Sequence, residues 1–132
     1  MNAKKSSGAK VYLMAQALFY LCFGMITLFY PKLMEMFQTS QGVSSGSAFA
    51  NNIWLHEGLD ILSIALLLFV LSRTTASPAI LRASAVVALM PFIAIIYSYF
   101  ETPFWNALFL VPAVTCLIFS GWGFMLAARK KD

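Results

Sequence analysis

Residues 51–71 read NNIWLHEGLDILSIALLLFVL, a long apolar segment that opens with a cluster of polar residues. It places three ionisable side chains, His56, Glu57 and Asp60, at the start of an apolar segment that is long enough to cross a bilayer. An Asp at the centre of a membrane-spanning helix costs roughly 2.5–3.5 kcal/mol, and less near the end of the helix. A segment that served only as an anchor would carry Leu at these positions. The stretch therefore predicts a membrane-spanning helix with a polar site.

The composition of the whole chain also indicates a membrane protein. Of its 132 residues, 61% are hydrophobic and 11% are charged, whereas soluble domains have about 45–50% apolar and about 25% charged residues. Four apolar segments, at about 11–30, 53–71, 83–100 and 104–126, approach spanning length. We therefore predict an all-α polytopic membrane protein, with residues 1–132 forming a single domain of four transmembrane helices in an antiparallel bundle.

The first apolar segment, the connection after it and the start of the last segment allow further structural predictions. Segment 11–30 is longer than the roughly 7–15 apolar residues of a signal peptide, so we expect it to be a retained first span. In the long connection that follows, 32–37 fits a short amphipathic turn, and 38–47 is flexible by composition. Pro103 is expected to open the last helix, at a position that needs no N–H donor.

The basic residues predict the orientation. Three lie before the first segment, two between the second and third, and three after the fourth, whereas the first connection has only Lys32. The positive-inside rule then places both termini in the cytoplasm, in a multi-pass protein of the inner or plasma membrane. Most acidic residues lie toward the opposite side, although acids contribute little to orientation, so their segregation needs another explanation.

Polar side chains on the second segment share one helical face. At 100° per residue, Asn52, His56, Asp60 and Ser63 fall within an arc of about 80°, with Glu57 beside it. Ionisable groups inside membranes almost always face the interior of a bundle. The face therefore predicts an acid–base or ligand-binding site near the outer leaflet, and the alternative is a satisfied polar network. Leu59, Leu62 and Leu66 of the same segment are expected to face lipid.

Other segments contribute residues to such a site. On the first, Gln16, Tyr20, Thr27 and Tyr30 share an arc, for which hydrogen bonding between helices is the alternative. The third segment ends, and the fourth begins, at the membrane level of the outer site. The candidate catalytic residues are Glu57, His56, Asp60 and Glu101. The candidate ligand contacts are Asn52, Ser63, Gln16, Tyr20, Trp105 and Asn106, where an aromatic belt is the alternative for Trp105.

Several chemistries are disfavoured by the motifs. The chain has one histidine and two cysteines without a CxxC pair, so we expect no metal site and no redox centre. It has no P-loop, Gly-x-Ser-x-Gly or Gly-x-Gly-x-x-Gly, so we expect no bound cofactor. The net charge of +4 does not indicate a nucleic-acid partner, because the basic residues gather at the ends of apolar segments.

Two short motifs carry a family resemblance. Tyr30-Pro31 closes the first segment, and Glu57-Gly58 leads into the second, in a chain of four expected helices with short tails. Over nearly its whole length the chain resembles the small four-helix DoxX-like membrane proteins. The resemblance implies a context, since members are linked to quinone-dependent oxidoreductase complexes and to accessory roles. It supplies no catalytic residue to carry over.

Three functions are consistent with these patterns. The first is an accessory subunit, or a protein that binds a lipophilic ligand such as a quinone or lipid, with a membrane protein or a second copy as partner in the bilayer. The second is an isomerase or hydrolase in which a shielded Glu57 is the acid and His56 with Asp60 the base. The third is a proton-coupled transporter, which is least favoured because the inner half offers no matching acid.

Overall fold

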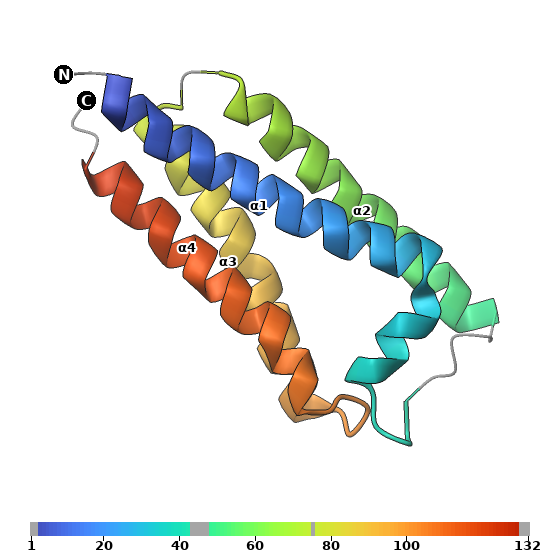
Figure 1. The fold of residues 1–132 in the computed structure, drawn as a ribbon. Coiled ribbons are helices and arrows are strands. Elements are labelled where there is room, and N and C mark those ends of the chain that lie inside the picture. The colour runs from blue at the N-terminus through green and yellow to red at the C-terminus, as the bar shows by residue number, and fades with distance from the viewer. Residues whose placement is uncertain (1–2, 43–47, 75, 130–132) are drawn as a thin grey trace.

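The computed structural model of the chain describes residues 3–42, 48–74 and 76–129, and these are almost entirely helical (Figure 1). The long helices are α1 (Ala3–Phe29), α2 (Ala48–Ser72), α3 (Pro78–Glu101) and α4 (Leu110–Arg129), and two 3-10 helices are η1 (Pro31–Phe37) and η2 (Ala107–Phe109). Four helical segments are long and apolar enough to cross a membrane: Gly8–Phe29, Asn52–Ser72, Pro78–Glu101 and Ala107–Arg129. The prediction of an all-α chain with four helices of spanning length is confirmed.

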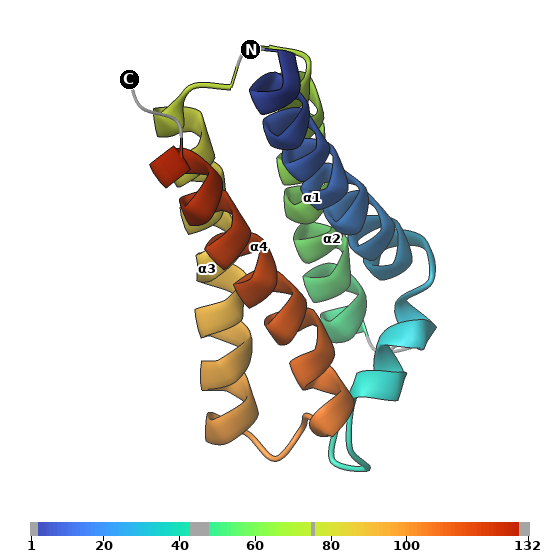
Figure 2. The same ribbon diagram turned by 60° about the vertical axis from the view of Figure 1, so that its left-hand side comes forward.

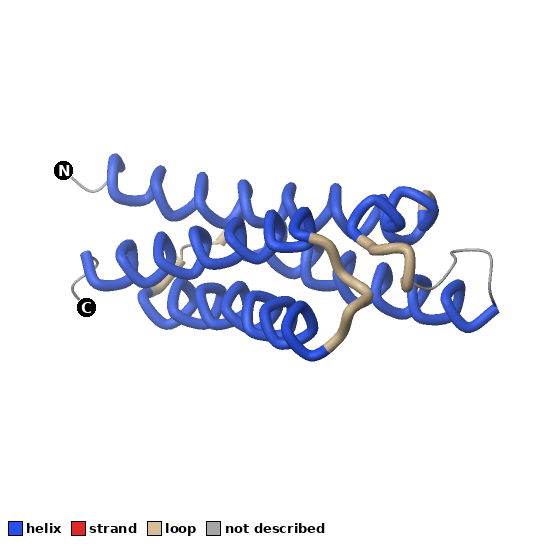
Figure 3. Tube along the Cα trace, turned by 90° about the horizontal axis from the view of Figure 1, so that it is seen from below, coloured by secondary structure: helices blue, strands red, loops and turns tan. Residues whose placement is uncertain are grey.

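The four long helices form two antiparallel pairs. α1 packs along α2 and α3 packs along α4, whereas contacts between the pairs are few and are most numerous between α1 and α4. We call the end where α1 begins and α4 ends the terminal end, and the end that holds η1 and η2 the distal end (Figures 1 and 2). The pairs diverge toward the distal end (Figure 1), and the connections lie at the two ends of the bundle (Figure 3).

Two glycines allow α1 and α2 to pack closely. A Cβ atom at Gly58 would lie 3.0 Å from Leu28 Cβ and 3.1 Å from the Leu28 backbone nitrogen, and one at Gly24 would lie 2.9 Å from Leu62 Cγ. Small residues let membrane helices approach in this way. The contact fixes the rotation of α2 about its axis. Leu62, expected to face lipid, packs against Gly24 instead.

At the terminal end, buried polar side chains join the two pairs. The Gln16 side-chain amide donates to the Ser84 backbone carbonyl over 3.1 Å, and the Ser84 hydroxyl lies 3.2 Å from the Tyr12 hydroxyl. The Tyr12 ring meets Trp122 of α4 edge-on, with 5.4 Å between ring centroids. Gly123 completes this contact, because a Cβ atom there would collide with the Tyr12 hydroxyl. We call Tyr12, Gln16 and Ser84 the terminal clamp.

At the distal end, residues 31–42, which we call the distal strap, join the α1–α2 pair to the connection between α3 and α4. Gln38 forms an isolated antiparallel bridge with Trp105. The Asn106 side-chain amide donates to the backbone carbonyls of Met36 over 2.7 Å and Gln38 over 3.0 Å. The Thr39 backbone N–H donates to Phe104 over 2.7 Å. Gln38 and Thr39, which were expected to be flexible, are therefore held by the connection between α3 and α4. Gln41 and Gly42 bond locally, to Thr39, and 43–47 lie outside the described residues.

The same contacts place the start of the last helix later in the chain than we predicted. We predicted that Pro103 opens it, but α4 begins at Leu110, after η2. Asn106 is the residue that caps η2, because its side-chain oxygen accepts from the Leu108 backbone N–H over 2.9 Å. Its own backbone N–H donates to Phe37 of the strap over 2.8 Å. The backbone after Pro103 thus pairs with the strap instead of forming a first helical turn.

Candidate functional site

Between the terminal clamp and the distal strap, the two helix pairs leave a partly open cavity of about 340 Å³. All four long helices contribute to its wall, which is mostly apolar. α1 supplies Phe23 and α2 supplies Ile61, while α3 and α4 supply Pro91 and Pro112. We call this the central cavity. It lies where the pairs, joined by the terminal clamp, diverge toward the distal end, at which the strap joins them again (Figure 1).

Glu57 is the one carboxylate in the described wall of the central cavity. It comes from α2 one residue before Gly58, whose contact with α1 sets the direction in which its neighbours point. Glu57 lines the cavity yet remains exposed, which places it on the open side. Within the described residues it has no ion pair or hydrogen-bond partner. Its carboxyl group is therefore available to a ligand that enters from that side.

Tyr20 adds a second polar group to the same wall. Its side chain is only 4% exposed, and its hydroxyl makes no hydrogen bond of good geometry to a described residue, although the side chains of Gln16 and Cys116 lie near it. A buried polar group left without a partner costs roughly 1–3 kcal/mol. Cys116 also lines the cavity, but a thiol is a weak hydrogen-bonding group. An oxygen atom of a ligand in the cavity would give the Tyr20 hydroxyl the acceptor that it lacks.

A proline in α3 frees one backbone acceptor beside these groups. Pro91 has no N–H, so the carbonyl of Val87, four residues earlier, lacks its usual donor within the helix. Both residues line the central cavity. The cavity thus combines one carboxyl group, one unpartnered hydroxyl and one helix carbonyl without its helical donor in an apolar surround.

The rest of the α2 polar face points away from the central cavity. Asn52, His56, Asp60 and Ser63 are exposed, and none of them lines it. Ser63 donates to the backbone carbonyl of Leu59 over 2.9 Å. The expected inward orientation therefore applies to Glu57 and not to these four residues. With Gly58 held against α1, a rotation of 100° per residue turns Glu57 toward the cavity and the shared face of the others outward.

The remaining candidate residues lie at the ends of the cavity or outside it. Gln16 belongs to the terminal clamp, and Asn106 has both amide hydrogens and its side-chain oxygen engaged in the strap and η2. Trp105 stacks on Phe109, with 4.0 Å between ring centroids. Glu101 is exposed at the last position of α3. These residues position the cavity or border the bundle, and the structure brings only Glu57 and Tyr20 together as candidate ligand contacts.

Comparison of the chain with protein-family profiles, with curated proteins and with solved structures gave no match. Within the described residues, no group of three or more His, Cys, Asp and Glu side chains is placed to hold a metal ion. The chemistry of the site is therefore argued from the central cavity itself. Sequence reasoning missed Cys116 as a wall residue. The prolines inside the third and fourth apolar segments were the available signal for the wall of α3 and α4.

Proposed function

We propose that the protein is a multi-pass membrane protein whose central cavity binds a lipophilic ligand with a polar head, such as a quinone or a lipid. One observation carries the proposal: Glu57 and the unpartnered hydroxyl of Tyr20 share the wall of an otherwise apolar, partly open cavity. Small-molecule sites usually have about 300–1,000 Å³ and a few convergent polar groups in an apolar lining. The volume of about 340 Å³ suits a head group whose chain leaves through the open side.

The two polar groups suit a ligand that carries oxygen atoms. The Tyr20 hydroxyl can donate a hydrogen bond to a carbonyl or hydroxyl oxygen of the ligand. Glu57 accepts from a ligand hydroxyl when it is ionised and donates to a carbonyl when it is protonated. The apolar wall holds the ring or chain by burial, at about 25 cal/mol for each Å² removed from water. Ring carbonyls of a quinone and ester or hydroxyl groups of a lipid share this chemistry.

Binding is better supported than catalysis or transport. An isomerase or hydrolase needs an acid and a base that converge on one substrate. Glu57 lines the central cavity, whereas His56 and Asp60 are exposed and do not line it, although Asp60 is near enough to Glu57 for their charges to interact. A proton-coupled transporter would need further acids along a path toward the terminal end, and no carboxylate of the described residues lines the cavity there. The arrangement of one carboxyl and one hydroxyl favours recognition of a head group.

The proposed membrane setting also bears on partners. With both termini in the cytoplasm, the exposed face formed by Asn52, His56, Asp60 and Ser63 would lie in the outer half of the bilayer. A charge exposed to hydrocarbon is expensive, and such groups normally find a protein partner. We therefore include in the proposal that a second copy or another membrane protein covers this face, in agreement with an accessory role.

The test is native mass spectrometry of the full chain after purification in mild detergent. We expect a bound lipophile, identified by extraction, and a mass that reports any partner. Glu57→Gln and Tyr20→Phe should each weaken binding of added quinone or phospholipid by roughly 5- to 150-fold. This range corresponds to the roughly 1–3 kcal/mol that is lost when a hydrogen bond is removed and its partner is left unpaired. Glu101→Gln and Tyr97→Phe are matched controls, because both side chains are exposed and neither lines the cavity.

Two results would overturn the proposal. One is a bare, partnerless monomer that binds neither added quinone nor added phospholipid. The other is equal binding by the cavity variants and the control variants. Size-exclusion profiles and thermal unfolding of each variant distinguish lost binding from lost fold.

A further inference from the structure

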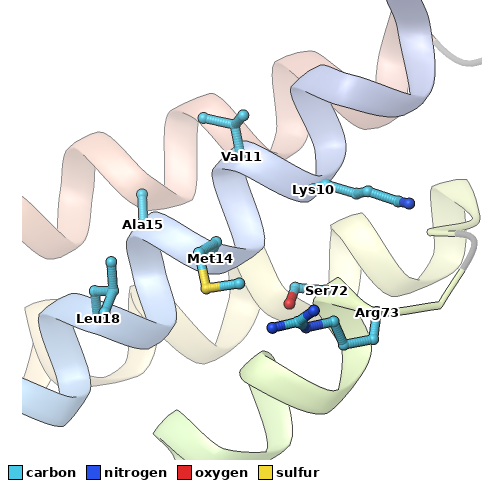
Figure 4. Close-up of a pocket in the computed structure, with 7 residues that line it drawn as sticks. All are labelled: Lys10, Val11, Met14, Ala15, Leu18, Ser72 and Arg73. Atoms are coloured by element: carbon cyan, nitrogen blue, oxygen red, sulfur yellow. The ribbon is translucent and has the colours of Figure 1, made fainter. Parts of the chain in front are cut away.

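A second hollow lies on the outer side of the α1–α2 pair, at the terminal end (Figure 4). It is a groove of about 650 Å³ between α1 residues from Lys10 to Leu18 and the end of α2 at Ser72 and Arg73. It is wider and more open than the central cavity, and the two share no lining residue. The groove therefore requires an explanation separate from the proposed ligand site.

Two cations border the groove. Lys10 extends from α1, Arg73 directly follows α2, and both line the groove (Figure 4). No acidic side chain of the described residues lines the groove. The Arg73 guanidinium lies over the Phe69 ring, 4.8 Å from its centroid, which restrains the position of its charge. A guanidinium in this position still has N–H groups that can donate to an anion, and their planar arrangement matches the oxygen atoms of a phosphate.

The wall below the cations is apolar. Val11, Met14 and Leu18 follow one another along the groove side of α1, and Val11 and Leu18 are exposed. From Val11 to Leu18 the helix rises about 10 Å, at about 1.5 Å per residue. A free phosphate ion would use the cations and gain nothing from this wall. A phospholipid would use both, because its chain lies beneath its charged head.

We infer that this groove binds one anionic phospholipid, with its phosphate between Lys10 and Arg73 and one acyl chain along Val11, Met14 and Leu18. Basic side chains near a membrane surface attract anionic lipid, and two of them correspond to roughly a 30-fold preference. The site is independent of the central cavity, so either site can fail without the other. It is also specific, because other cations at the terminal end, such as Arg82, do not line the groove.

The test compares phosphatidylglycerol with phosphatidylcholine of the same acyl chains, added to the full-length protein and followed by native mass spectrometry. The unaltered protein should retain phosphatidylglycerol with roughly a 30-fold preference. The double variant Lys10→Gln/Arg73→Gln should lose this preference. The matched control Arg82→Gln/Arg129→Gln removes two exposed charges from the same end outside the groove, and it should keep the preference.

Two further arms identify the source of the phosphate. Inorganic phosphate at millimolar concentration should leave the retained phosphatidylglycerol in place, and Val11→Asn/Leu18→Asn should weaken lipid retention although both cations remain. The inference is overturned if the groove double variant keeps its preference or if the control variant loses it equally. It is also overturned if inorganic phosphate displaces the lipid, because the groove would then be a simple anion site. Size-exclusion profiles show that each variant is folded.

Discussion

Gly58 determines how closely α2 approaches α1, and we expect Gly58→Ala to destabilise the protein. The added Cβ would lie 3.1 Å from the Leu28 backbone nitrogen, and a backbone atom cannot move aside as a flexible side chain can. Overpacking of this kind costs about 1–3 kcal/mol. The measurement is thermal or denaturant unfolding in detergent. The same substitution should also reduce ligand binding in the central cavity, because it rotates or shifts Glu57.

Gly121 provides the matched control for this prediction. A Cβ atom at Gly121 would meet nothing within 4 Å. Gly121→Ala in the interior of α4 should therefore be neutral or stabilising by up to about 1 kcal/mol. Equal unfolding midpoints for the two variants would show that the contact between Gly58 and Leu28 does not limit the approach of α1 and α2.

Individual residues also show what helical periodicity can and cannot predict. On α1 the predicted arc is buried at Gln16, Tyr20 and Thr27, whereas Tyr30 is 63% exposed because α1 ends at Phe29. On α2 the four predicted polar residues do share a face, but that face is the exposed one. Periodicity fixes which residues lie together. The direction they face depends on a contact with another helix, here that of Gly58 with α1, which the spacing of polar residues does not reveal.

At the scale of elements, the distal strap depends on Asn106, and we expect Asn106→Ala to release it. The substitution removes the bonds to the carbonyls of Met36 and Gln38 and the cap on η2. Hydrogen exchange at the Thr39 amide, which donates to Phe104, should then accelerate, and stability should fall by roughly 1–3 kcal/mol. Asn52→Ala is the control, because Asn52 is exposed. Unchanged Thr39 exchange in Asn106→Ala would contradict the role of the strap.

The helices differ in whether residues nearby in the sequence determine where they begin. The start of α3 is local, because Ser77 accepts from the Ile80 backbone N–H over 3.2 Å and Pro78 follows it. The start of α4 is not local, because Asn106 and the backbone after Pro103 pair with the strap about 70 residues earlier in the chain. Hydropathy therefore predicted four helices of spanning length. It could not predict the strap, which joins the two helix pairs at the distal end.

At the scale of the whole molecule, the terminal clamp and the distal strap explain why a cavity lies between the helix pairs. The clamp joins α1 to α3 through Gln16 and Ser84, and the strap joins the α1–α2 pair to the connection before α4. The few other contacts between pairs leave the middle of the bundle unfilled. The composition indicated a bundle but not the space between the two helix pairs. Apolar residues face lipid, another helix or a cavity alike, so their positions in the sequence do not distinguish these surroundings.

The basic residues argue for a single orientation of the whole molecule, because eight of the nine lie in the sequence before the first apolar segment, between the second and third, or after the fourth, and only Lys32 lies between the first and second. In a background of Cys22→Ser and Cys116→Ala, a membrane-impermeant maleimide should label Ser40→Cys in intact cells and Thr74→Cys only after permeabilisation. Both positions are exposed, at opposite ends of the bundle, so each is a control for the other. The reverse pattern, or equal labelling in intact cells, would refute cytoplasmic termini. It would also move the groove at Lys10 away from the anionic cytoplasmic leaflet.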